Sequence, residues 1–223
     1  MMVPKLITML TNHDVTVKNA REVFLSCADL ACEFWGFKDV GLAPSDMRDL
    51  ADVMREKGKI TFLESVNLDE GGSDRAAQLA TDCGVDYFLG TIYSPKVHAT
   101  LAKSKTKYMP FCGVVHGHPT VLDGSPDEIL LDAKRLEGLG ASGVDLLAYR
   151  NPDRPEEAAR KLVEGLTIPV IIAGSIDTFE RLDRMKQIQP WAFTIGGAFF
   201  SKRFVPNGTF RQQMESVIAY LAR

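Results

Sequence analysis

Two apolar runs near the end of the sequence each stop on small residues, in the stretches PVIIAGSID and WAFTIGGAFF. The runs Val170–Ala173 and Ala192–Ile195 lack polar alternation, which predicts strands covered on both faces. Gly174-Ser175 and Gly196-Gly197 then occupy strand-to-helix turns, where free backbone N–H groups and a helix dipole can hold an anion. We therefore predict a phosphate-binding site, the alternative being that the glycines only permit tight turns.

The lysine in FWGFKDVGL is the most unusual charge in the sequence. Lys38 follows Phe34, Trp35 and Phe37, and packing against these rings would remove water from its amine. Loss of water lowers the pKa of a lysine and frees the amine for Schiff-base or general-base work, so we predict a catalytic Lys38. In the alternative, the ammonium group reaches solvent or pairs with Asp39.

The glutamate in ITFLESVN interrupts an otherwise apolar run, one strand further along the chain. A carboxylate at the upper end of a strand could take a proton from a substrate or pair with Lys38. We predict a catalytic Glu64, with a purely structural ion pair as the alternative.

The stretch FCGVVHGHP carries two histidines beyond the fifth strand. We predict that His116 acts as an acid or base, since histidine titrates near neutral pH. His116 and His118 could also bind a divalent metal ion together with Glu64 or Asp69. Two histidines in a long loop are more often solvated, and we predict no metal site.

The stretch DLLAYRNPD ends the sixth strand. Arg150 suits phosphate or carboxylate oxygens through its forked guanidinium group, so we predict that it binds substrate. The alternative is a surface arginine paired with Asp153. Asp145 falls at the opposite end of the same strand, the end that serves stability in a barrel, and we do not place it in the site.

The elements that must position these residues follow a repeating pattern, in which short apolar runs alternate about eight times with segments of helical periodicity. The predicted strands are Leu6–Leu10, Phe34–Val40, Ile60–Val66, Tyr87–Ile92, Tyr108–Val114, Val144–Tyr149, Val170–Ile176 and Phe193–Phe199. The predicted helices begin near Thr16, Ser45, Ser73, Pro95, Pro126, Pro155, Thr178 and Thr209.

Eight such units predict an α/β fold, a single (β/α)8 TIM barrel of eight parallel strands that occupies residues 1–223 as one domain. A doubly wound open sheet is the competing fold. It would place a glycine-rich dinucleotide loop after the first strand, where the sequence reads MLTNHD instead. We therefore favour the barrel and predict no nucleotide cofactor.

Composition limits the partners and the compartment. No stretch approaches the roughly 20 apolar residues that cross a bilayer, and the start of the chain lacks the features of a signal peptide. The four cysteines have no CxxC spacing, which favours reduced thiols in a cytoplasmic protein. The net charge is −3 without a Lys/Arg run, which disfavours nucleic acid. Aromatics in FWGF and AFFSKRF are compatible with a homodimer or with core packing.

Two family resemblances follow from these stretches. PVIIAGSID and AFTIGGAFF resemble the seventh- and eighth-strand loops of the ribulose-phosphate-binding barrel superfamily. That likeness implies a phosphorylated ligand whose phosphate contacts Gly174, Ser175, Gly196 and Gly197. A longer part of the chain is similar in layout to the glycerol-3-phosphate-responsive antiterminators, a barrel family that senses its ligand. The matching positions there are Gly58-Lys59, Asn67-Leu68, Glu70-Gly71 and Asp74.

A third likeness touches Lys38 alone. GFKDVG resembles the DVKNP-like setting of the Schiff-base lysine in class I aldolase-like barrels that build phosphorylated furans. Together these observations predict an isomerase, epimerase, aldolase or lyase acting on a small phosphorylated sugar or carbonyl metabolite. A non-catalytic sensor of glycerol 3-phosphate is the main alternative, and a barrel whose upper face binds protein is a second one.

Overall fold

The computed structural model describes residues 3–117 and 120–223. Eight parallel strands form one sheet in the order β10-β11-β12-β1-β4-β5-β6-β7. Their bounds are β1 Lys5–Met9, β4 Phe34–Lys38, β5 Ile60–Ser65, β6 Tyr87–Gly90, β7 Lys107–Met109, β10 Val144–Leu146, β11 Val170–Ile172 and β12 Ala192–Ile195. A parallel bridge between Phe111 and Asp145 joins the two edge strands. The predicted (β/α)8 barrel is confirmed.

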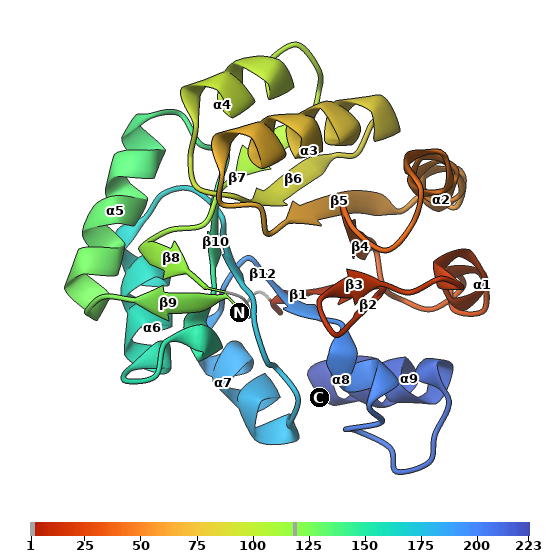
Figure 1. Ribbon diagram of the computed structural model, residues 1–223. Coiled ribbons are helices and arrows are strands. Elements are labelled where there is room, and N and C mark those ends of the chain that lie inside the picture. The colour runs from red at the N-terminus through yellow and green to blue at the C-terminus, as the bar shows by residue number, and fades with distance from the viewer. Residues whose placement is uncertain (1–2, 118–119) are drawn as a thin grey trace.

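Helices surround the sheet (Figure 1). Their bounds are α1 Ala20–Leu25, α2 Pro44–Glu56, α3 Glu70–Cys83, α4 Pro95–Leu101, α5 Pro126–Gly138, α6 Pro155–Gly165, α7 Phe179–Ile188, α8 Gly197–Phe200 and α9 Phe210–Leu221, with a 3-10 turn η1 at Ala148–Arg150. Side-chain caps start several of them, including full capping boxes at Ser125 and Thr209. Seven of the eight predicted starts lie within three residues of a helix start.

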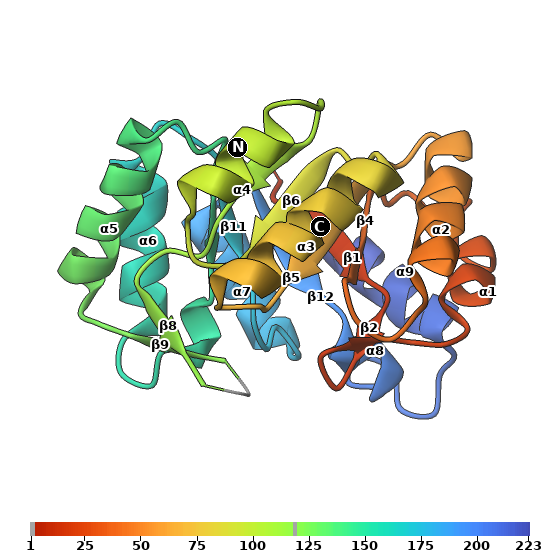
Figure 2. The same cartoon turned by 45° about the horizontal axis from the view of Figure 1, so that its top comes forward.

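The helix start predicted near Thr16 is four residues early, because α1 begins at Ala20. Thr16 belongs instead to an antiparallel hairpin of β2 (Thr11–Asn12) and β3 (Val15–Thr16). A second hairpin, β8 (Val114–His116) with β9 (Val121–Asp123), follows β7. Both hairpins lie at the same end of the barrel, on opposite sides of it (Figures 1 and 2).

All eight predicted strands run past the observed strand ends, by one to five residues, and two of them show a clear physical reason. The strand at Tyr108–Val114 ends at Met109, because Pro110 has no N–H to continue the ladder. The strand at Phe193–Phe199 ends at Ile195, because Gly196 has φ −130° and ψ −89° and the next four residues form α8.

The barrel interior is apolar toward the amino ends of its strands. Phe34, Phe62, Tyr87 and Trp191 pack there with ring centroids 4.8–6.4 Å apart. The aromatics of FWGF lie in the core, with Trp35 and Phe37 at 0% exposure. Their burial removes the support that these rings gave to a homodimer.

No helix in residues 3–117 and 120–223 is long and apolar enough to cross a membrane.

Candidate functional site

A cavity of about 330 Å³ opens at the carboxyl ends of the strands. Seven of the eight predicted site residues line it: Lys38, Glu64, Arg150, Gly174, Ser175, Gly196 and Gly197. Asp14, from the turn of the β2–β3 hairpin, lines it as well. The cavity therefore unites the predicted phosphate loops with the predicted catalytic pair.

Lys38 and Glu64 face each other from neighbouring strands. They are direct partners in the β4–β5 register, and Lys38 Nζ lies 3.5 Å from Glu64 Oε1. The side chains are only 6% and 8% exposed. Lys38 Nζ also donates a hydrogen bond to Asp14 Oδ1 at 2.9 Å. Lys38 thus pairs with Glu64 and Asp14, and not with Asp39, whose carboxylate accepts hydrogen bonds from Ser65 and Asn67.

The expected lowering of the Lys38 pKa does not occur. Burial by itself would lower it, but the negative charges of Glu64 and Asp14 raise the pKa of Lys38 above its ordinary value. Burial likewise would raise the pKa of Asp14, yet the charges of Lys38 and Arg150 hold it below its usual range. Lys38 is therefore a cation at neutral pH, suited to stabilising negative charge and not to attacking a carbonyl carbon.

Asp14 is a site residue that sequence reasoning missed. Its φ is +60° and that of His13 is +49°, the left-handed region that tight turns use. Thr16 fixes the hairpin because its hydroxyl both accepts a hydrogen bond from Lys38 N and donates one to Lys38 O, each at 2.8 Å. The sequence TNHDVT places His13 and Asp14 between two short threonine-containing segments. Because aspartate is common in turns, this sequence could have indicated the hairpin.

Arg150 reaches the cavity from η1. Its NH2 group lies 3.5 Å from Asp14 Oδ2, while its Nε is buried and has no hydrogen-bond partner among the residues that the structure describes. The pairing with Asp153, which was the alternative to a substrate-binding role, is absent among the described residues. Arg150 therefore keeps donor capacity for an anionic ligand.

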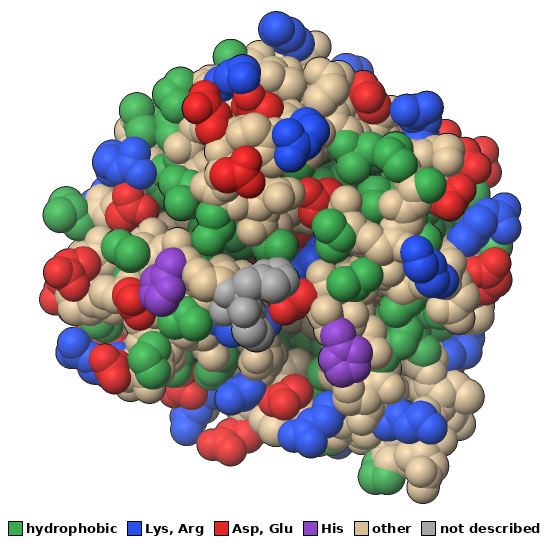
Figure 3. All heavy atoms as spheres, in the orientation of Figure 1, with side chains coloured by type: hydrophobic (Ala, Val, Ile, Leu, Met, Phe, Trp, Pro, Cys, Tyr) green, Lys and Arg blue, Asp and Glu red, His purple; other side chains and the backbone are tan. Residues whose placement is uncertain are grey.

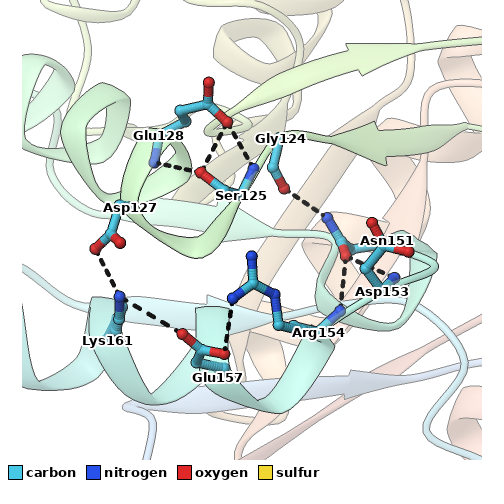
Figure 4. A network of polar contacts seen from close by, with 9 residues as sticks. All are labelled: Gly124, Ser125, Asp127, Glu128, Asn151, Asp153, Arg154, Glu157 and Lys161. Atoms are coloured by element: carbon cyan, nitrogen blue, oxygen red, sulfur yellow. Dashed lines mark hydrogen bonds and ion pairs between the residues drawn. The ribbon is translucent and has the colours of Figure 1, made fainter.

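The loop that follows Arg150 is held by a polar network between α5 and α6 (Figure 4). Asn151 Nδ2 donates to Gly124 O at 3.1 Å, and Asn151 Oδ1 accepts from the backbone N–H groups of Asp153 and Arg154. Lys161 pairs with Asp127 at 2.6 Å across the same helices. These contacts fix where η1 leaves the barrel and so where Arg150 enters the cavity.

The two predicted phosphate loops lie side by side after β11 and β12. Gly174 and Ser175 have φ values of +83° and +52°, which turn the backbone sharply after β11. Asp177 beyond them is ion-paired with Arg181 at 2.9 Å and with Arg203 at 3.5 Å. The loops thus offer glycine backbone to the cavity, which Asp177 and Arg203 line beside them.

Gly196 should tolerate no side chain. A Cβ there would lie 2.6 Å from Thr11 Oγ1 and 3.0 Å from Thr11 O, whereas a Cβ on Gly197 would lie 3.7 Å from Asn12 Oδ1. We expect Gly196→Ala to lower the free energy of unfolding by about 1–3 kcal/mol and the control Gly197→Ala to change it by less than about 0.5 kcal/mol. Urea denaturation measures both, and equal effects would contradict the close packing of the loop on Thr11.

The structure does not bring His116 to the cavity. It lies exposed on β8, where its Nε2 is 2.6 Å from Asp123 Oδ2 of β9. Its predicted acid–base role therefore has no support from the geometry. His118 lies outside the described residues, among which no cluster of metal-ligating side chains is found.

Asp145 differs from its expected placement. It is fully buried in the barrel interior, near enough to Glu64 and Lys38 for their charges to act on its carboxyl group.

Acidic and basic side chains are intermixed over the end of the barrel seen in Figure 3.

The fold and the cavity define the class of the protein: a (β/α)8 barrel with a polar cavity at the carboxyl ends of its strands. No family model and no curated protein matches the sequence. Among solved structures, the chain is similar to orotidine 5'-phosphate decarboxylase from Pyrococcus horikoshii, with a TM-score of 0.71 and 11% identity over 98% of this chain and 99% of that chain.

Two further solved structures are similar over most of the chain. N-(5'-phosphoribosyl)anthranilate isomerase from Pyrococcus furiosus has a TM-score of 0.64 and 15% identity over 98% of each chain. The glycerol uptake operon antiterminator regulatory protein from Listeria monocytogenes has a TM-score of 0.59 and 15% identity over 86% of this chain and 91% of that chain. At these identities the likeness establishes the barrel fold alone, and it confirms at that level the two larger resemblances inferred from the sequence.

Proposed function

We propose that this barrel is an enzyme that moves a proton next to the carbonyl group of a small phosphorylated metabolite, as isomerases and epimerases do. The observation that carries the proposal is the buried Lys38–Glu64 pair, which lines the same cavity as the glycine loops after β11 and β12. Such a cavity holds a remote phosphate and a reactive centre together.

Each part of the cavity has a chemical role in this proposal. Gly174, Ser175, Gly196 and Gly197 bind the phosphate through backbone N–H groups. Glu64 accepts the proton from the substrate carbon, and the Lys38 cation stabilises the enolate oxygen that forms.

Two further groups complete the proposed cavity. Asp14 holds the Lys38 ammonium group in place through its hydrogen bond of 2.9 Å. Arg150 contributes a second cation for the anionic substrate. Because Lys38 is cationic, imine formation of the aldolase type has less support than proton transfer.

The similar structures support the choice of substrate class by analogy. Orotidine 5'-phosphate decarboxylase and N-(5'-phosphoribosyl)anthranilate isomerase are both named for phosphorylated compounds. The same barrel fold hosts unrelated chemistry in other proteins, so the argument for this chain rests on its cavity.

A non-catalytic sensor of glycerol 3-phosphate is the second candidate. It is favoured by the antiterminator-like layout of the chain and by the shared fold with the Listeria antiterminator protein. Such a sensor would use the same phosphate loops and would leave its ligand unchanged.

Deuterium exchange separates the two candidates. Wild-type protein is incubated in heavy water with ribose, ribulose and triose phosphates, and loss of the carbon-bound proton signal is followed by NMR. The enzyme should exchange deuterium into at least one sugar phosphate. Binding of glycerol 3-phosphate without exchange or product from any compound would favour the sensor.

A further inference from the structure

One acidic side chain inside the barrel has no partner in the described part of the chain. Asp145 is 0% exposed, and neither of its carboxyl oxygens has a hydrogen-bond partner within residues 3–117 and 120–223. Only its backbone is engaged, with N donating to Pro110 O at 2.9 Å and O accepting from Cys112 N at 3.4 Å. An ionised carboxylate loses its hydration in such a place and gains no compensating contact. The unionised acid is the form that this environment favours.

Asp145 lies beside the cavity without lining it. It pairs with Phe111 across the seam of the barrel and with Ile171 on the other side. Phe111 and Leu147, its neighbour two residues along the chain, do line the cavity. The carboxyl group is therefore separated from a bound ligand by the side chains that form the cavity floor.

Three titratable groups from other segments act on Asp145 or respond to it. Burial raises the pKa of Asp145 well above its usual range, Glu64 on β5 raises it further, and Lys38 on β4 lowers it. Cys112, in the segment after β7, has a thiol pKa raised well above its ordinary value by burial and by the charges that Asp145 and Asp132 would carry when ionised. The charge of Glu64 thus acts on Asp145, although Asp145 is fully buried and Glu64 lines the cavity.

The charges at the strand ends balance without Asp145. Lys38 and Arg150 face Asp14 and Glu64 in ion pairs of 2.9–3.5 Å. A negative Asp145 would add an unbalanced charge beneath a cavity that we propose binds an anion. Of two neighbouring carboxyl groups, the more deeply buried one can carry the proton, and no unbalanced negative charge then remains.

We propose that Asp145 is the proton-bearing partner of Glu64: it keeps a proton beneath the cavity, so that the negative charge rests on Glu64 beside Lys38. Asp145 is then a positioning residue that sets which carboxyl group is the base. The role of Glu64 as base rests on the proposed function. The protonation of Asp145 can be measured without any substrate.

Infrared difference spectroscopy tests the proposal. Subtracting the spectrum of Asp145→Asn from that of wild type at neutral pH should reveal the carbonyl band of an unionised carboxyl group, shifted in heavy water. The control Asp86→Asn removes an exposed carboxylate that accepts hydrogen bonds from Thr61, and should show no such band. Loss of carboxylate bands alone in Asp145→Asn would overturn the proposal.

The coupling to Glu64 has its own readout. In Glu64→Gln the negative charge that opposes ionisation of Asp145 is gone, so the unionised band should titrate at a lower pH than in wild type. A purely structural buried acid outside the influence of Glu64 would titrate at the same pH in both proteins, and that result would overturn the pairing. Neither spectrum depends on turnover, so a failure to find a substrate would count against the proposed function alone.

Stability gives an independent measurement. Because the folded-state pKa of Asp145 is raised, its contribution to stability is complete below the unfolded-state pKa of about 3.9 and is lost as the pH rises toward the folded-state pKa. Asparagine does not ionise, so the Asp145→Asn variant does not lose stability in this way as the pH rises. Its Tm relative to wild type should therefore increase between about pH 4 and pH 7, by at least about 2 °C. A difference independent of pH, or failure of the near-isosteric variant to fold, would overturn the proposal.

Discussion

Replacing Lys38 with methionine is expected to lower the free energy of unfolding by about 3–5 kcal/mol, because it strands the buried Glu64 carboxylate without a cation. The side chains of Lys38 and Glu64 are 6% and 8% exposed, so water can restore little of the lost interaction. Chemical denaturation at neutral pH measures the loss.

The double variant Lys38→Met with Glu64→Gln is the control for this loss. It removes the stranded charge as well as the cation, and should recover part of the stability. A loss below about 1 kcal/mol in Lys38→Met, or no recovery in the double variant, would mean that the pair is not the buried electrostatic unit described above. The pKa of Lys38 also predicts how this stability depends on pH. Because folding raises that pKa, the stabilisation by Lys38 is complete below the ordinary pKa of lysine, about 10.4, and is lost as the pH rises through the folded-state pKa.

Replacing Glu64 with glutamine is expected to slow deuterium exchange into the substrate by about 10²–10⁴-fold, because the amide keeps the shape of the side chain but cannot accept the proton. Phosphate-ligand affinity should stay within about tenfold of wild type, since the loops that hold the phosphate are unchanged. NMR exchange rates and ligand titrations measure the two quantities.

Glu56→Gln, at the exposed end of α2, is the matched control and should leave exchange unchanged. Equal loss of exchange and of ligand binding in Glu64→Gln would assign Glu64 to binding alone. Unchanged exchange would remove it from the mechanism.

The fold could be predicted because its signal is repetitive. Eight apolar runs separated by helical segments leave few topologies, and caps such as Ser125 and Thr209 mark where helices begin. The ends of strands were harder to predict, because an apolar run continues through residues such as Pro110 that cannot extend the ladder.

The part of the site that lies directly after the strands could also be predicted. Residues directly after a strand, such as Lys38 and Gly174, follow from the rule that barrel sites lie at the carboxyl ends of strands. Asp14 escaped because the hairpin that carries it reads as a helix start. His116 was misplaced with respect to the cavity because its side chain on β8 is exposed and pairs with Asp123 of β9, whereas Thr120 of the same hairpin lines the cavity.

The position of Asp145 depends on the stagger between strands. Its place near the start of β10 suggested the stability end of the barrel. Strands in a closed barrel are sheared against one another, however, so the early position of β10 lies level with Phe111, beyond the end of β7. The position of a residue along its own strand cannot reveal that offset. The direction of the Lys38 pKa shift could not be predicted either, because it depends on Glu64 and Asp14, which only the fold brings next to Lys38.

The central claim, that the cavity binds a phosphorylated metabolite through the glycine loops, is tested most directly by thermal unfolding against inorganic phosphate, glycerol 3-phosphate, and ribose, ribulose and triose phosphates. A ligand at 100 times its Kd should stabilise wild type and Gly197→Ala by about 2.7 kcal/mol. Gly197→Asp, which places a carboxylate in the loop, should lose that stabilisation. No shift with any phosphate compound, or an equal shift in Gly197→Asp, would contradict the claim.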